Sequence, residues 1–389
     1  KLIMHEKIIL QDFTVLLICI SQKWSTIERR VLFDSTFLRN SGCTPVILCE
    51  EGSQLDIAAE KEDISRVYIN TKVHFLVNFK VLKELRNLIL EKRFDLIHCY
   101  SLRSARLAAF ILKSHHKIPL ILTNNQITKN YKYNFFNRWL LRRIDYVFTL
   151  SEELKDFSSE LLPLPERKIQ SLGGGLEVFK HDTKREEVRN ISCVINNLNE
   201  LNRLKKIIKI FRVLKGSRED FLKLQLCIFL GPRIYQKEKA KKILTEFDYE
   251  FYEGDIQLFS LDARESELKN TDIFIGTAFD EPLNDYEIVA LMNEIPVLFP
   301  RTAARQDLLF KFSWIGESYF EEDIREAKTK LIKIITNYPI YKNALQESSE
   351  KILEYHGLEA YAQKLQMYYE KAFEKRYRLS SKKSVKKLT

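Results

Sequence analysis

The sequence TDIFIGTAFDEPLNDYEIVALMNEIPV, residues 271–297, contains the pattern from which the architecture of this chain is predicted. A short apolar run at 272–275 is followed by a polar segment, a helical pattern at 287–292 and a second apolar run at 296–299. Short apolar runs bounded by turn residues are typical of buried parallel strands. A strand, a helix and a second strand in this order predict a parallel sheet covered by helices.

The same alternation recurs along most of the chain and predicts a doubly wound α/β architecture. Further strands are expected at residues 13–20, 45–49, 66–69, 95–99, 119–123, 145–150, 191–195 and 224–230. Further helices are expected at residues 27–40, 81–91, 104–114, 136–143, 204–214 and 236–246, and then without intervening strands at 327–336, 341–355 and 358–373.

The alternation is interrupted once, which predicts two domains. Residues 173–175 are three of the chain's 11 glycines, and a polar, charged segment follows them. Domain boundaries fall in such segments. The sequence therefore predicts a Rossmann-like N-terminal domain over 1–175, a linker over 176–190, a second Rossmann-like domain over 191–355, a helix over 356–375 that returns to the first domain, and a basic tail over 376–389.

Composition excludes several classes of protein. With 389 residues, 45% hydrophobic and 30% charged, the chain is too long for a single small binding module and too apolar for a disordered protein. Lys and Arg exceed Asp and Glu by 63 − 53 = 10 charges. This surplus favours anionic partners: nucleotide phosphates, acidic lipid headgroups or nucleic acid.

The six cysteines form no CxxC pair and lie mostly in apolar runs, so we expect reduced, buried cysteines and a cytoplasmic location. The apolar run at 13–20 is far shorter than the ~20 residues needed to span a bilayer, and no secretory signal is visible.

Residues 375–389 carry seven basic residues and no acidic one. They favour either a frayed, solvated terminus or a contact with the anionic inner surface of a membrane, where each basic residue contributes about 1 kcal/mol. Nucleic acid is the weakest alternative, because no RNA- or DNA-binding motif is present.

Common catalytic motifs are missing. The sequence has no GxGxxG after its first strand, no GxxxxGK[ST], no HExxH and no GxSxG. Its seven histidines lack the spacing of metal ligands, so no metal is expected. The default ligand is a phosphorylated molecule at the carboxyl ends of the strands, where helix N-termini point their N–H groups.

The stretch at 271–297 resembles the C-terminal motif of family 4 glycosyltransferases with the GT-B fold. In that family a strand and loop lead into a helix and strand that carry two glutamates separated by seven residues, and Glu281 matches the first. Residues 95–101, 142–154 and 165–179 are similar to further family segments, so the resemblance covers about 13–375.

The resemblance implies two Rossmann-like domains that face each other across a cleft, and an enzyme that needs no metal or other cofactor. Its reaction would move a sugar from a nucleotide-diphosphate donor to a glycan or lipid-linked acceptor with retention. The barrier lies in the departing diphosphate, which fixed cations and N–H dipoles stabilise. Glu281 would bind hydroxyls of the transferred sugar.

Several donor-site positions depart from the family pattern. Asn197 and Asn202 occupy the positions of an arginine and a lysine, so both expected cations are missing. Val289 replaces the second glutamate, and Pro282 replaces a glycine whose N–H would face the donor. Without compensation, losing two charged hydrogen bonds of ~1.5–3 kcal/mol would slow diphosphate departure roughly 10²- to 10⁴-fold.

Nearby basic residues offer compensation, or else form a solvated helix face. They are Arg203, Lys205, Lys206 and Arg233. Because Leu283 and Asn284 follow Pro282 in the same loop, they are also expected to face the donor.

Two positions are expected on the acceptor side. Trp24 lies in a segment that replaces a glycine-rich loop, and Asn125 replaces a histidine. The sequence thus leaves a second function open, a catalytically degenerate relative that serves as a binding, chaperone or scaffold partner.

Overall fold

The computed structural model describes residues 12–22, 24, 26–68, 79–112, 117–124, 135–176, 178, 187–195, 201–231, 255–260, 268, 270–277 and 284–385. The chain forms two compact units. Unit 1 comprises residues 1–173 together with 359–389, and unit 2 comprises residues 174–358. The change from unit 1 to unit 2 thus falls inside the run of three glycines.

Unit 1 is built on a seven-stranded parallel sheet with the strand order β3-β2-β1-β4-β5-β6-β7. Its strands are β1 (Thr14–Ile18), β2 (Thr44–Cys49), β3 (Ser65–Tyr68), β4 (Leu96–Cys99), β5 (Leu120–Thr123), β6 (Tyr146–Thr149) and β7 (Ile169–Ser171). Its helices are α1 (Thr26–Asn40), α2 (Gln54–Lys61), α3 (Phe79–Glu91), α4 (Leu102–Ile111), α5 (Phe135–Leu141), α6 (Glu152–Leu161) and α14 (Leu358–Val385).

Unit 2 has a six-stranded parallel sheet with the order β10-β9-β8-β11-β12-β13. Its strands are β8 (Asn190–Ile195), β9 (Gln225–Leu230), β10 (Ile256–Ser260), β11 (Ile273–Ile275), β12 (Val297–Pro300) and β13 (Gly316–Tyr319). Its described helices are α7 (Leu201–Lys215), α10 (Asp285–Met292), α11 (Ala303–Lys311), α12 (Ile324–Thr336) and α13 (Tyr338–His356). The expected doubly wound α/β class is confirmed in both units, and the expected helix at 236–246 lies outside the described residues.

The sheets are buried on both faces, which is why their central strands are continuous apolar runs. Leu16, Leu48 and Ile97 belong to one core cluster of unit 1, and Leu17 and Ile47 belong to a second one. Alternate residues of a strand point to opposite faces, so the two clusters lie on the two sides of the sheet. All six cysteines are buried and free, as expected.

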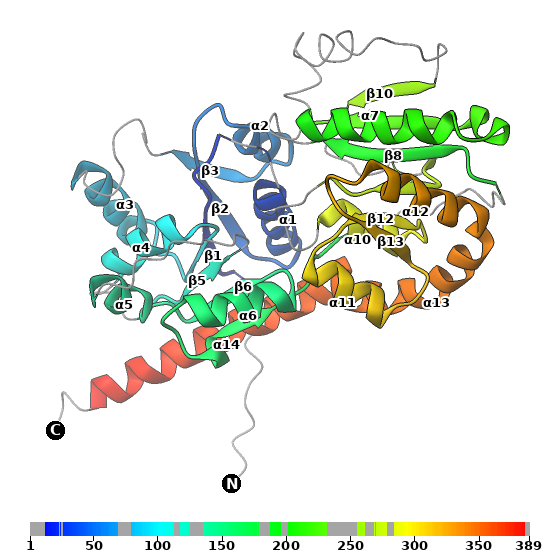
Figure 1. Cartoon of the computed structure of the whole chain (residues 1–389). Coiled ribbons are helices and arrows are strands. Elements are labelled where there is room, and N and C mark those ends of the chain that lie inside the picture. The colour runs from blue at the N-terminus through cyan, green and yellow to red at the C-terminus, as the bar shows by residue number, and fades with distance from the viewer. Residues whose placement is uncertain are drawn as a thin grey trace. The chain divides into compact units, whose positions relative to one another are not determined.

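The last helix, α14, packs on unit 1, although it follows unit 2 in the chain (Figure 1). Tyr361, Leu365, Tyr369 and Ala372 recur at helical spacing and are fully buried in the unit 1 core. The helix continues to Val385, ten residues beyond its expected end at 375. The first part of the expected basic tail, residues 376–385, is therefore helical.

Polar contacts also fix α14 to unit 1. The hydroxyl group of Tyr361 donates to the Asp34 carboxylate at 3.1 Å, and Tyr100 donates to the same oxygen. Further along the helix, the guanidinium group of Arg376 lies 2.7 Å from the carboxylate of Asp145. Both carboxylates are almost completely buried, so each contact ties a core group of unit 1 to this helix.

Candidate functional site

The carboxyl edge of the second sheet is where the sequence leads us to expect the donor site. Because every strand pair is parallel, β8, β11, β12 and β13 all end at this edge, and the connections to α7, α10 and α11 begin there. This is the edge at which ligands bind in doubly wound sheets.

Six of the expected site residues lie outside the described residues, namely Asn125, Asn197, Arg233, Glu281, Pro282 and Leu283. The backbone of Asn202 lies in the first turn of α7. The expected roles of these residues therefore stay predictions. At the carboxyl edge of the second sheet, the structure describes Gly276, Asn284 and the first turns of α7, α10 and α11.

The N-terminus of α10 is capped by its own side chains. Asn284 Oδ1 accepts a hydrogen bond from the backbone N–H of Tyr286 at 2.9 Å. In return, Glu287 Oε2 accepts one from the backbone N–H of Asn284 at 3.2 Å, which completes a capping box. Asp285 and Glu287 also place two carboxylates in this first turn. Two donors that the helix would offer to an anionic ligand are therefore already bonded.

Behind this turn, Glu287 and Arg305 form a buried ion pair. Arg305 Nε lies 2.9 Å from Glu287 Oε2, and Arg305 Nη2 lies 2.9 Å from Glu287 Oε1. Neither side chain is exposed. Burial raises the pKa of Glu287, while the charge and hydrogen bonds of Arg305 and the Asn284 N–H act in the opposite direction. The pair joins α10 to α11 beneath the carboxyl edge.

Gly276, the first residue after β11, lies against this pair. A Cβ atom at Gly276 would come within 2.2 Å of Glu287 Oε1 and 2.7 Å of Pro300 Cδ. Any side chain there would push the carboxylate out of place. From the sequence, Glu287 was considered only as a poor substitute for the glutamate missing at Val289, and Arg305 was not considered. The available signal was a charged residue at the start of the apolar run EIVALM.

Val289, at the position of the family's second glutamate, lies in the core of unit 2 with an exposed fraction of 0%. It packs in an apolar cluster that also contains Phe274 and Leu291. The side chain carries no polar atom, so it offers no hydrogen bond to a sugar hydroxyl.

Three basic residues of α7 whose side chains the structure describes were expected near the donor. Lys206 Nζ lies 2.7 Å from a carboxylate oxygen of Glu322 and 3.3 Å from one of Glu321, and the hydrogen bond to Glu322 raises the pKa of Lys206. The charge of Lys206 is therefore balanced within unit 2. Arg203 and Lys205 are half-buried on the same helix.

In unit 1, Trp24 lies in the connection between β1 and α1, at the carboxyl edge of the first sheet. Its side chain is half-buried and packs against the cluster that contains Leu17 and Val31. This position agrees with a residue at the ligand edge, and its acceptor-side role stays a prediction.

The family-like segment at 95–101 contains His98, which the structure places in the core. Its Nδ1 lies 2.6 Å from the Tyr369 hydroxyl, and its Nε2 lies 2.7 Å from Thr123 Oγ1. Burial lowers the pKa of His98 to about 3, so the ring is neutral at physiological pH. His98 thus joins β4, β5 and α14.

Three aspartates of the family-like segments lie at the opposite, amino edge of the sheets. Asp95 accepts a hydrogen bond from the N–H of Thr14, and Asp145 accepts one from the N–H of Leu120. Asp272 accepts two, from Arg189 and Asn190. Each carboxylate accepts a hydrogen bond from the first N–H group of a neighbouring strand, and Asp272 also accepts one from the residue before its strand. These aspartates therefore fix strand register rather than bind a ligand.

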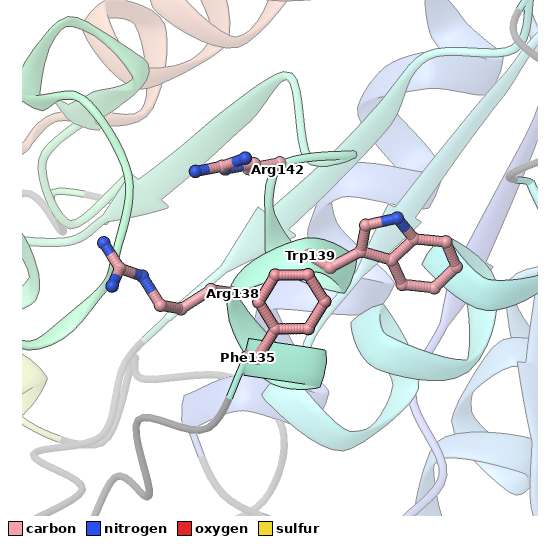
Figure 2. A pocket seen from close by; sticks show the side chains of 4 residues that line it. All are labelled: Phe135, Arg138, Trp139 and Arg142. Carbon is pink, nitrogen blue, oxygen red and sulfur yellow. The ribbon is translucent and has the colours of Figure 1, made fainter.

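A separate cavity of about 340 Å³ lies on α5 of unit 1, where Phe135, Arg138, Trp139 and Arg142 line it (Figure 2). Phe135 is 86% exposed and Trp139 is 37% exposed. In Figure 2 the two guanidinium groups lie to one side of the Phe135 ring and the indole lies to the other. Of these four residues, only Arg142 belongs to one of the family-like segments of the sequence, 142–154.

In the part of the chain that the structure describes, no helix combines the length and apolar character needed to cross a membrane. Within the same residues, no three side chains of His, Cys, Asp or Glu come together as a metal-binding group.

Comparison with solved structures shows the fold. A glycosyltransferase from Rickettsia africae ESF-5 is 15% identical in sequence and superposes with a TM-score of 0.71, over 93% of this chain and 98% of that one. The Anabaena protein HepE, solved in complex with UDP-glucose, is 9% identical with a TM-score of 0.69, over 92% of this chain and 99% of its own. Sucrose-phosphate synthase from Thermosynechococcus elongatus is 11% identical with a TM-score of 0.64, over 93% and 99%.

Comparison of sequences is informative for unit 1. Residues 27–178 match the family model described as Glycosyltransferase Family 4. No curated protein matches the chain in sequence. The matched segment runs from α1, without its first residue, through β7, and thus contains most of the first sheet. The chain therefore has the GT-B fold, and its N-terminal unit carries the sequence pattern of family 4 glycosyltransferases.

Proposed function

We propose that this protein transfers a sugar from a nucleotide-diphosphate donor to an acceptor hydroxyl on a glycan or lipid-linked molecule, with retention and without a metal ion. The observation that carries the proposal is the family match over residues 27–178. The similarity of the whole chain to HepE, whose structure holds UDP-glucose, supports a nucleotide-sugar donor.

The donor would bind at the carboxyl edge of the second sheet. Glu281 lies in the connection between β11 and α10, and its proposed role is to bind hydroxyls of the transferred sugar. Asn197, Asn202, Lys205 and Arg233 would contact the diphosphate from α7 and from the segments that follow β8 and β9 in sequence. We further propose a cytoplasmic location at the inner surface of a membrane, in keeping with the net charge of +10.

Calorimetric titration tests the donor site. We expect UDP or GDP to bind, and we expect Glu281→Ala to weaken the binding of the matching nucleotide sugar while leaving the free nucleotide unaffected. This difference arises because only the nucleotide sugar carries the hydroxyls that Glu281 would bind. Glu354→Ala, at an exposed position on α13, is the matched control. Absence of binding by every nucleotide at millimolar concentration would contradict the proposal.

A second candidate function is that of a catalytically degenerate partner of an active transferase. Two observations favour it: the N-terminus of α10 is internally capped, and the fully buried Val289 stands where the family has its second glutamate. If no nucleotide binds, this candidate predicts that an active transferase co-purifies with the chain. If nucleotide sugar binds and is turned over, the candidate is excluded, and the anomeric configuration of the product, read by NMR, tests retention.

A further inference from the structure

The outward face of α5 combines aromatic and basic side chains. Phe135 and Trp139 are four residues apart, as are Arg138 and Arg142. Arg142 directly follows the helix, and its N–H still bonds the Arg138 carbonyl oxygen at 3.2 Å, so the four side chains fall on one face about 100° wide. Leu140 and Leu141 point to the opposite face and are buried in unit 1. The helix therefore packs one face against the core of unit 1 and carries two large aromatic rings on its outward face.

The exposure of these aromatic rings to water is unfavourable in free energy. A Phe side chain gains about 1.5–3 kcal/mol when it is transferred from water to an apolar environment, and 86% of Phe135 stays accessible. Trp139 is partly exposed beside it and lines the same cavity. Aromatic rings next to cations are typical of surfaces that enter the interface of a lipid bilayer.

The cations of this face have no partner among the described residues. Neither guanidinium group, of Arg138 or of Arg142, makes a hydrogen bond or ion pair there, and no acidic residue of the described chain lines the cavity. An anionic group is therefore the complementary ligand.

Further positive charge lies where α5 ends. Lys168 Nζ donates to the carbonyl oxygen of Arg142 at 3.2 Å, and Arg376 Nη2 donates to that of Arg143 at 3.0 Å. Burial lowers the pKa of Lys168 to about 8, and the charges of Lys375, Arg376 and Arg143 act in the same direction, although Asp145 opposes them. Lys168 and Arg376 thus lie next to the carbonyl groups that follow α5.

We propose that the α5 face, formed by Phe135, Arg138, Trp139 and Arg142, is a docking surface for an anionic lipid bilayer, with the two rings in the interface and the two arginines on lipid phosphates. The inference deepens the peripheral-membrane part of the proposed function. It does not depend on donor chemistry, because the surface lies wholly within unit 1.

Binding to vesicles tests the docking surface. The full chain is sedimented with phosphatidylcholine vesicles, with and without phosphatidylglycerol. We expect binding only to the anionic vesicles, and we expect high salt to weaken it. Arg138→Gln with Arg142→Gln should lower the partition coefficient about 25-fold, since each arginine near an anionic surface contributes about fivefold. Phe135→Ser with Trp139→Ser should lower it at least as much.

Matched variants control for general loss of charge and apolar area. Lys83→Gln with Arg86→Gln removes two exposed cations from α3 of the same unit, and Phe310→Ser removes a 92% exposed ring from α11 of unit 2. Both should bind anionic vesicles like the unmodified protein. Equal loss in these controls, or unchanged binding by the α5 variants, would overturn the proposal.

Fluorescence locates the contact. Of the three tryptophans, Trp139 alone lies on α5, so brominated lipid should quench the unmodified protein and should quench the Trp139→Phe variant much less. Equal quenching of both proteins would refute contact through α5.

Two further titrations, with glycerol phosphate and with nucleotide, separate the alternatives. Saturable binding of free glycerol phosphate to the same arginines would show a small-phosphate site instead of a docking surface. Nucleotide binding, measured without lipid, should be unchanged in the α5 variants, so the donor site and the docking surface can fail independently.

Discussion

The carboxylate of Glu287 and the guanidinium group of Arg305 meet in two parallel hydrogen bonds of 2.9 Å, and both side chains are completely buried. The partners are 18 residues apart and come from the first turns of α10 and α11. Removing one partner leaves an uncompensated charge in the interior.

We therefore expect Arg305→Met to lower the free energy of unfolding by about 3–5 kcal/mol. Replacing both residues, with Glu287→Leu added, should restore most of the lost stability, because no buried charge remains. Denaturation by urea measures both effects. If the single and double variants are equally unstable, the loss comes from packing rather than from the unpaired carboxylate.

Glu294 offers the opposite case, a stabilising substitution. It follows the end of α10 with φ of 58°, in the left-handed region that disfavours residues with a Cβ atom. Glu294→Gly should raise the free energy of unfolding by about 1 kcal/mol. Lys342 donates to the Glu294 carbonyl oxygen, which the substitution keeps. A decrease in the melting temperature would contradict this expectation.

His98 makes the stability of unit 1 depend on pH. Its pKa is about 3 in the fold against 6.5 for a free imidazole, so between these values the unfolded chain binds the extra proton. The stabilisation of the fold by neutral His98 is fully present above pH 6.5. As the pH falls below this value, the free energy of unfolding decreases by up to about 1.4 kcal/mol per pH unit. His98→Asn should flatten the pH dependence of unfolding between pH 6.5 and pH 4.

Asp34 changes the stability of unit 1 with pH in the direction opposite to that of His98. Burial raises its pKa from 3.8 to about 6, although Arg30 and the hydroxyl groups of Tyr100 and Tyr361 oppose the shift. The folded state therefore binds more protons between these values, and the stabilisation present below pH 3.8 is lost as the pH rises through 6. Relative to the Asp34→Asn variant, the unmodified protein should gain stability as the pH falls from 6 to 4. Parallel pH profiles of the two proteins would show that Asp34 keeps its ordinary pKa.

Arg376 tests the attachment of α14. Its guanidinium group bonds the buried Asp145 carboxylate, and charged hydrogen bonds contribute about 1.5–3 kcal/mol. Arg376→Ala should make the end of α14 more sensitive to trypsin and lower stability by about that amount. Lys375→Ala is the control, because its Nζ lies 3.9 Å from Asp145 and its side chain is 43% exposed. Equal effects of the two variants would indicate a loss of net charge only.

The central strands could be predicted from sequence because burial on both faces makes them continuous apolar runs. Both edge strands of the second sheet, β10 and β13, were missed for the complementary reason. β13 has the sequence GESY, in which Glu317 pairs with Lys330 and Lys333, and the half-exposed β10 has the sequence IQLFS. Neither sequence carries the apolar signal of a central strand.

The candidate site, too, could be predicted from the sequence only in part. The Asn284 and Glu287 spacing matches a capping box and could have been recognised, whereas the pairing of Glu287 with Arg305 depends on how α10 and α11 pack. The aromatic face of α5 was also missed, since residues 136–143 read as an ordinary amphipathic helix and the exposed fraction of Phe135 is set by tertiary packing.

The passage of the chain through unit 2 before α14 returns to unit 1 imposes an order on synthesis. Tyr361, Leu365 and Tyr369 complete the core of unit 1, but a ribosome reaches them only after all of unit 2 has been made. Until then the nascent first unit leaves the hydrophobic surface that α14 will cover open to solvent, although domains generally fold as they emerge. Unit 2 can therefore mature first, and the N-terminal half of this protein is the last to finish folding.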